Sequence, residues 1–250
     1  MNICKGAHLK IERANKHISE LGSSIDGLRK RLICVAHIDP NSGCEFIKCD
    51  FASIQDRYIV DDLPAIIGDA VHNLKCALDY IWLETITRLV PANDWERTKF
   101  PAYPDQYMLE CALRNLQIHI SAPHFFDFLV TKIKAYRGGD FSIWPVHKLD
   151  VGDKHRLLIP VIHYTSISDI YVEDQNGDIY RTETWGTFKP FPHYVKLERG
   201  NHIKNPGSLS FAVVFQDGDG IEFSAPNTLR FYAERILTIV ETFEAFVEAR

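Results

Sequence analysis

A stripe of unusual polar residues marks the segment 63–90, which the spacing of apolar residues predicts to be a long helix. At roughly 100° per residue, these polar side chains fall opposite an apolar arc. Asp, Asn and His favour helices less than the Glu, Lys, Gln and Arg that usually fill a solvated face. The stripe therefore predicts a polar partner, either a buried network within the chain or a substrate. Its members are Asp69, His72, Asn73, Cys76, Asp79 and Tyr80.

His72 is the member of this stripe best suited to chemistry, because an imidazole gains and loses a proton near neutral pH. We expect Asn73 and Asp69 to orient the reacting groups. A purely structural network and a simple solvated face remain the alternatives for the same stripe.

A second cluster of ionisable residues follows Trp144 and His147 and ends in Asp153, Lys154, His155 and Arg156. In a functional interpretation, His155 transfers a proton, Arg156 binds a phosphate through two hydrogen bonds and Lys154 adds positive charge. In a structural interpretation, Asp153 caps a helix that begins at Lys154. The functional interpretation requires this cluster to fold against the stripe that carries His72.

Helical periodicity predicts the elements that would position these groups. Apolar residues recur three and four apart over 11–32 and 229–247, so we expect a helix near each end of the sequence. Besides the central helix at 63–90, shorter helices are expected at 106–116 and 123–136.

Strands are expected where β-prone runs flank turn residues. Such runs predict hairpins at 32–50, at 169–182 around Asn176-Gly177, and at 210–224. The sequence thus predicts an α+β protein with a bundle-like N-terminal part, an antiparallel β-rich segment and a C-terminal helix that packs back. It divides into parts 1–156 and 157–250, or forms one compact domain.

Composition excludes several classes of function. The 250 residues are 46% hydrophobic and 24% charged, which is typical of a globular core, and the net charge of −5 means that any nucleic acid would need a local basic patch. No signal-like start and no run of about 18 apolar residues is present, so we expect a cytoplasmic protein without membrane contact. Phosphate-binding glycine loops, serine-esterase elbows and zinc-protease motifs are missing.

Metal sites are weak alternatives, and no cofactor is expected. Cys34, His37, Cys44 and Cys49 supply zinc-type ligands on one hairpin, but residues at odd separations point to opposite faces of a strand. Asp69 and His72 supply half of a dimetal motif, and a second half is missing. The six cysteines contain no CxxC pair and are expected to be reduced thiols.

The polar stripe and the Asp-Lys-His-Arg run also resemble a family of largely uncharacterised bacterial and phage-associated proteins. That family shares an early helix similar to 8–14, a segment similar to 67–80, a Phe-Pro loop similar to Phe100-Pro101, and a run similar to 153–156. The likeness covers roughly the first two thirds of the chain.

More distantly, the helical core resembles the HEPN superfamily, whose members include metal-independent RNases of bacterial defence and toxin systems. That superfamily places Arg four to six residues before His, a spacing that Arg114 and His119 match as a second candidate pair. The resemblance implies an RNA- or nucleotide-directed nuclease. We also expect a protein partner or a homo-oligomer. The alternative is a non-catalytic module in which the same residues form a buried network and the β-rich segment binds a protein partner or a second copy of the chain.

Overall fold

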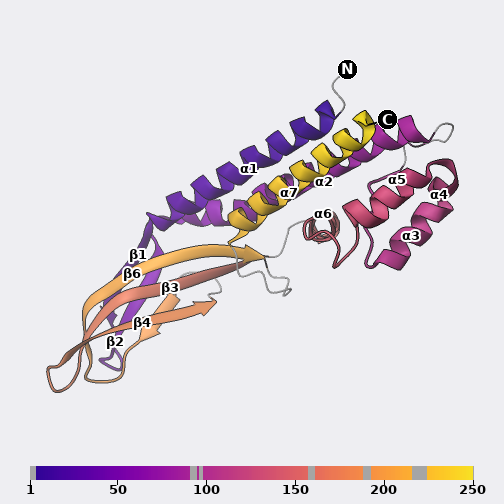
Figure 1. Cartoon of the computed structure of the whole chain (residues 1–250). Helices are drawn as coiled ribbons and strands as arrows, with labels where there is room; N and C mark the ends of the chain where they lie inside the picture. Colours follow the sequence, from indigo (N-terminus) through magenta and orange to yellow (C-terminus); the bar gives the residue numbers. More distant parts are fainter. Residues whose placement is uncertain are drawn as a thin grey trace. The chain divides into compact units, whose positions relative to one another are not determined.

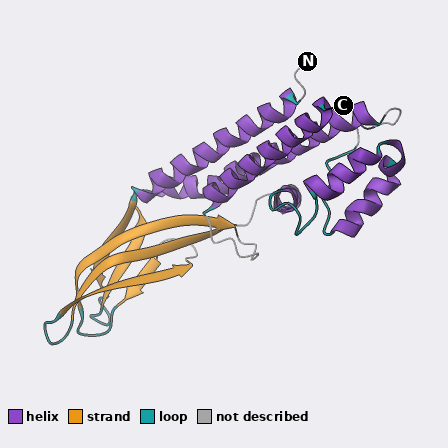
Figure 2. Ribbon diagram, viewed as in Figure 1, coloured by secondary structure: helices purple, strands orange, loops and turns teal. Residues whose placement is uncertain are grey.

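The computed structural model describes residues 4–90, 95, 98–156, 161–187, 193–215 and 224–249 (Figures 1 and 2). The chain forms two compact units. The helical unit comprises Met1–Ser19, Ala65–Ile159 and Pro226–Arg250, and the sheet unit comprises Glu20–Pro64 and Pro160–Ala225. The α+β class is confirmed. The grouping differs from the predicted division into 1–156 and 157–250, because the first hairpin pairs with a later strand and the C-terminal helix packs with earlier helices.

Three long helices follow the predicted apolar stripes: α1 (Lys5–Arg29), α2 (Ile54–Leu89) and α7 (Ala225–Glu248). The predicted start of the central helix at Leu63 is wrong. At the true start, the backbone N–H of Ser53 and its hydroxyl both donate to Asp56 Oδ2, at 3.2 and 3.0 Å. This contact stabilises the first turn, and Pro64 is accommodated inside the helix.

The core of the helical unit is aromatic. Trp82, Phe125 and Phe243 are among its largest fully buried side chains. Phe128 packs edge-on against Phe243 with ring centroids 5.1 Å apart, and stacks on Phe246 at 4.1 Å. These contacts join α7 to the segment that begins at Phe128 and explain why the C-terminal helix belongs to this unit.

Shorter helices complete the helical unit. α3 (Gln106–Asn115) confirms the helix expected at 106–116, and α4 (Ile118–Ser121) follows it. The helix expected at 123–136 divides into α5 (Pro123–Asp127) and a π-helix (Phe128–Ile133), which ends at Lys134 in the left-handed conformation.

Helix α6 (Ile143–Arg156) carries the second ionisable cluster. Asp140 stands before its first turn and accepts hydrogen bonds from the backbone N–H of Ser142 and of Ile143, at 2.8 and 3.3 Å. Arg235 of α7 donates to the other carboxylate oxygen at 2.7 Å. The prediction that a helix begins at Lys154 under an Asp153 cap is therefore wrong, because Asp140 already starts the helix that contains both residues.

The sheet unit contains two antiparallel three-stranded sheets. The first has the order β1 (Leu32–Ile38), β2 (Glu45–Phe51), β5 (His193–Lys196), and the second β4 (Ile179–Thr187), β3 (Val161–Glu173), β6 (His202–Phe215). The hairpins expected at 32–50 and 169–182 are confirmed. In the third predicted hairpin, residues 216–223 lie outside the described residues, and β6 pairs with β3.

Apolar residues from both sheets form the core of the sheet unit. Its buried members are Ile47, Cys49, Ile167, Ile170 and Val172. Glycine is required at position 207 of β6, because its φ is +85° and a Cβ there would lie 2.4 Å from the carbonyl oxygen of Ser168. Within the described residues, no helix has the length and apolar character needed to cross a membrane.

The Asp140 contacts predict a pH-dependent contribution to stability. Burial raises the pKa of this carboxyl, but the hydrogen bonds from Ser142 and Arg235 outweigh burial and hold the pKa below its usual value. The stabilisation is therefore complete above the unfolded-state pKa of about 4 and is lost as the pH falls through the folded-state pKa. We expect Asp140→Asn to lower the free energy of unfolding by about 1–3 kcal/mol at neutral pH.

Urea unfolding of parent and variant over a series of decreasing pH values measures this effect. The exposed Asp127 of α5 supplies the matched control, and Asp127→Asn should change stability by less than about 0.5 kcal/mol. A difference between parent and Asp140→Asn that stayed constant into acid would contradict the prediction.

Candidate functional site

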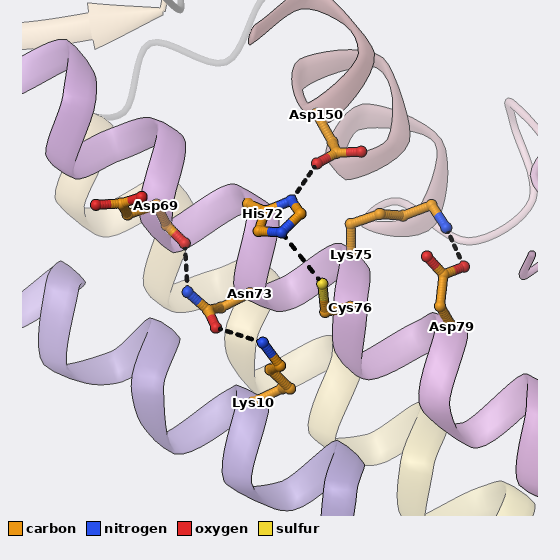
Figure 3. Close-up of polar contacts among 8 residues, drawn as sticks. All are labelled: Lys10, Asp69, His72, Asn73, Lys75, Cys76, Asp79 and Asp150. Carbon is orange, nitrogen blue, oxygen red and sulfur yellow. Dashed lines mark hydrogen bonds and ion pairs between the residues drawn. The ribbon is translucent and has the colours of Figure 1, made fainter. Parts of the chain in front are cut away.

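Two acidic residues of the ionisable cluster on α6, Asp150 and Asp153, lie against α2. His72 Nδ1 is 3.0 Å from Asp150 Oδ1 (Figure 3). One turn earlier on α2, a Cβ added to Gly68 would lie 2.8 Å from Asp153 Oδ1, so Gly68 leaves room for that carboxylate. Two segments 78 residues apart therefore meet, and this is the arrangement that the functional interpretation of the cluster requires.

The sequence of α6 explains which face it turns to α2. Ile143, Val146, Asp150 and Asp153 are three or four residues apart and share one side of the helix. The first two are fully buried, whereas the last two place carboxylates beside His72 and Gly68. The face is thus apolar at its start and acidic at its end.

His72 is held on one side and reachable on the other. Its side chain is 47% exposed, whereas that of Asp150 is 5% exposed. With the proton on Nδ1, the imidazole donates to Asp150, and Nε2 is left as a base. Cys76 Sγ, one turn along α2, lies 3.4 Å from Nε2 (Figure 3). A carboxylate that orients an imidazole beside a hydroxyl or thiol is the arrangement used in general-base and nucleophilic catalysis.

Asn73 is engaged within the protein on both sides of its amide. Its Nδ2 donates to the backbone carbonyl of Asp69 at 2.8 Å, and Lys10 of α1 donates to its Oδ1 at 3.4 Å. The residue is only 8% exposed. The carboxylate of Asp69 points away from Asn73 in Figure 3. These contacts join α1 to α2 through the side chain of Asn73.

An ion pair on α2 between a buried lysine and a partly exposed aspartate escaped the sequence analysis. The ammonium of Lys75 pairs with the carboxylate of Asp79, which also accepts from the backbone N–H of Phe100 at 2.8 Å. Lys75 is only 3% exposed. Burial, and then the nearby charge of Lys75, lower the pKa of His147 on α6, so this second imidazole is neutral at pH 7.

The other predicted residues are placed less completely. Lys154, His155 and Arg156 belong to α6, and their side chains lie outside the described residues. Arg114 and His119 both approach Phe126: the guanidinium lies over the ring at 5.1 Å from its centroid, and the imidazole centroid is 6.2 Å away. In the structure, both residues of this second candidate pair pack on the ring of Phe126.

Asp150 is the site residue that sequence reasoning missed. It belonged to the ionisable cluster, but the cluster was interpreted as a helix start. Interpreted instead as a helix end, the spacing of Asp150 and Asp153 would have placed both carboxylates on one face.

No metal site emerges among the described residues, where no group of three or more His, Cys, Asp or Glu side chains is arranged to hold an ion. On the first hairpin, Cys34 lies opposite Cys49, whereas His37 lies opposite Phe46 and stacks on its ring. His37 therefore projects from the other face of the hairpin, away from this cysteine pair.

Comparison of the chain with family models, with curated proteins and with solved structures gives no match. Function is therefore inferred from the geometry of the site.

The Lys75–Asp79 pair predicts an asymmetric response to mutation. Asp79→Ala leaves the buried ammonium of Lys75 without its counter-ion and the N–H of Phe100 without an acceptor. We therefore expect a loss of about 3–5 kcal/mol in the free energy of unfolding. Lys75→Met leaves a partly exposed carboxylate that still accepts from Phe100, with a loss of about 1–2 kcal/mol.

Denaturant unfolding of both variants and of the Lys75→Met/Asp79→Leu double variant measures the coupling energy between the two residues. The double variant should lose less free energy of unfolding than the sum of the two single variants. The control is Glu110→Ala, which removes an exposed hydrogen bond from Gln106 on α3 and should cost no more than about 0.5 kcal/mol. Equal losses for Lys75→Met and Asp79→Ala would refute the asymmetry.

Proposed function

We propose that this chain is a metal-independent phosphodiesterase that acts on RNA or a nucleotide, with His72 as its proton-transfer group. One observation carries the proposal: the half-exposed imidazole of His72 is oriented by the buried carboxylate of Asp150. A carboxylate in that position fixes the tautomer that leaves Nε2 free to accept a proton and stabilises the imidazolium that forms.

RNA suits this set of groups because it brings its own nucleophile. Nε2 of His72 removes the proton from a ribose 2′-hydroxyl, whose oxygen attacks the adjacent phosphorus. The bond to the 5′ oxygen breaks, that oxygen takes a proton from a general acid, and a 2′,3′-cyclic phosphate remains. His155 is the residue we assign as acid, and we assign charge stabilisation on the phosphorane-like transition state to Lys154 and Arg156.

The position of α6 supports these assignments. Its last turn carries Lys154, His155 and Arg156 directly after Asp153, whose carboxylate lies beside Gly68, one turn of α2 from His72. A protein with a net charge of −5 requires a local group of cations of this kind to hold a phosphodiester. The likeness to RNases of bacterial defence and toxin systems favours the same substrate class.

A thiol-dependent acyl transfer is a second candidate, favoured by the 3.4 Å between Cys76 Sγ and His72 Nε2. In that reaction Cys76 attacks a carbonyl carbon after giving its proton to His72. The two candidates share His72 and Asp150 and differ in whether the nucleophile comes from the protein or from the substrate.

We predict that His72→Asn and Asp150→Asn each reduce cleavage of a fluorogenic oligoribonucleotide by about 10²- to 10⁴-fold, because the base or its orientation is lost. Cys76→Ala should keep cleavage within about threefold of the parent, since a contact that is not used in the transition state contributes little to rate. The assay is run in EDTA, and a matched 2′-deoxy oligonucleotide should not be cut.

His124→Asn is the control for loss of an imidazole, because His124 is exposed on α5 and lies outside the site. Thermal unfolding of every variant excludes misfolding as the cause of lost activity. If Cys76→Ala loses activity to the same extent as His72→Asn, the acyl-transfer candidate is favoured. Hydrolysis of p-nitrophenyl acetate tests that candidate. If the folded parent cleaves neither substrate, both catalytic proposals are abandoned in favour of the non-catalytic interaction module.

A further inference from the structure

Two thiols face each other across the first hairpin of the sheet unit. Cys34 of β1 is the direct partner of Cys49 of β2 in the register, and their Sγ atoms are 3.2 Å apart. Cys49 is fully buried in the sheet core, and Cys34 packs against that core while remaining partly exposed on an edge strand.

The hydrogen-bond pattern of the hairpin decides how close these residues can come. The N–H of Ala52 donates to the carbonyl of Arg31, and the N–H of Asp39 donates to that of Cys44, at 2.7 and 2.9 Å. Antiparallel pairs alternate between hydrogen-bonded and non-hydrogen-bonded along a ladder. Counting from either bond, Cys34 and Cys49 form a non-hydrogen-bonded pair, in which Cα atoms approach to about 4.5 Å. That distance lies within the range of about 4.4–6.8 Å that a disulfide spans.

We propose that Cys34 and Cys49 are a redox modification site at which a peroxide closes an intramolecular disulfide. The Cys34 thiolate attacks one peroxide oxygen, the O–O bond breaks, and Cys34 becomes a sulfenic acid with release of one water. Cys49 then attacks the Cys34 sulfur, and the S–S bond forms as a second water leaves. Two thiols lose two electrons in total, and hydrogen peroxide is reduced to two waters.

The surroundings support this order of events. The hydrogen bond from Cys49 lowers the pKa of Cys34, which favours the thiolate on the more exposed residue. The hydrogen bond to Cys34 and burial raise the pKa of Cys49, so it remains a thiol until the sulfenic acid forms beside it. A sulfenic acid next to a resolving thiol condenses to a disulfide faster than it oxidises further.

The full chain, first reduced and then treated with hydrogen peroxide, tests the proposal. We expect a product lighter by two hydrogen atoms, with thiols titrated after denaturation reduced by two from the six of the chain. Cleavage before Asp39 and after Lys48 separates Cys34, Cys44 and Cys49 into different peptides. Tandem mass spectrometry should find Cys34 joined to Cys49.

Matched variants distinguish this pair from a generally reactive hairpin. Cys34→Ser and Cys49→Ala should abolish the product, whereas Cys44→Ser, at the end of the turn between them, should leave it unchanged. Closing the loop should raise the unfolding temperature of the parent by about 5–10 °C, reversibly on adding dithiothreitol. A peroxide product that links Cys44, or oxidation of Cys111 and Cys76 while Cys34 and Cys49 stay free, would overturn the proposal even if the variants fail to fold.

Discussion

The packing of α6 on α2 depends on a polar partner for the buried carboxylate of Asp150. A carboxylate that is 5% exposed has lost nearly all of its hydration, and that loss is offset only by hydrogen bonds or an opposite charge. His72 supplies this partner from α2, and Gly68 keeps the next turn of α2 clear for Asp153. Asp140 starts α6 at the position that brings Asp150 to His72. The contact that positions the helix is therefore the same contact that orients the imidazole of His72.

Burial divides the polar side chains of α2 between Asp69 and Asp79 into two groups. Asn73 and Lys75 are buried, and buried polar groups require partners inside the protein, which Asp69, Lys10 and Asp79 provide. His72 is half-exposed and uses only one of its nitrogens to hold Asp150. The structural interpretation therefore fits the buried Asn73, whereas the proposed catalytic role falls on the half-exposed His72.

Periodicity predicted α7, whose burial repeats regularly, and turn residues predicted the Asn176-Gly177 hairpin. Sequence reasoning failed where a single cap decided the boundary. Ser53 with Asp56 begins α2 ahead of Pro64, and Asp140 begins α6 well before Asp153. It also failed for Lys75, because lysine is almost never buried unless paired, and the pairing with Asp79 places the ammonium inside. The meeting of α2 with α6 is a tertiary contact, and no local pattern specifies it.

The first hairpin shows how strand parity selects among several chemistries that one composition allows. Cys34 and His37 are separated by an odd number of positions, so they project from opposite faces of β1 and do not share a tetrahedral ion. Cys34 instead lies on the same face as Cys49, which points into the core. Because the two residues form a non-hydrogen-bonded pair, their backbones lie close together. A hairpin rich in cysteine and histidine is thus unsuited to zinc for the same geometric reason that it brings two thiols together.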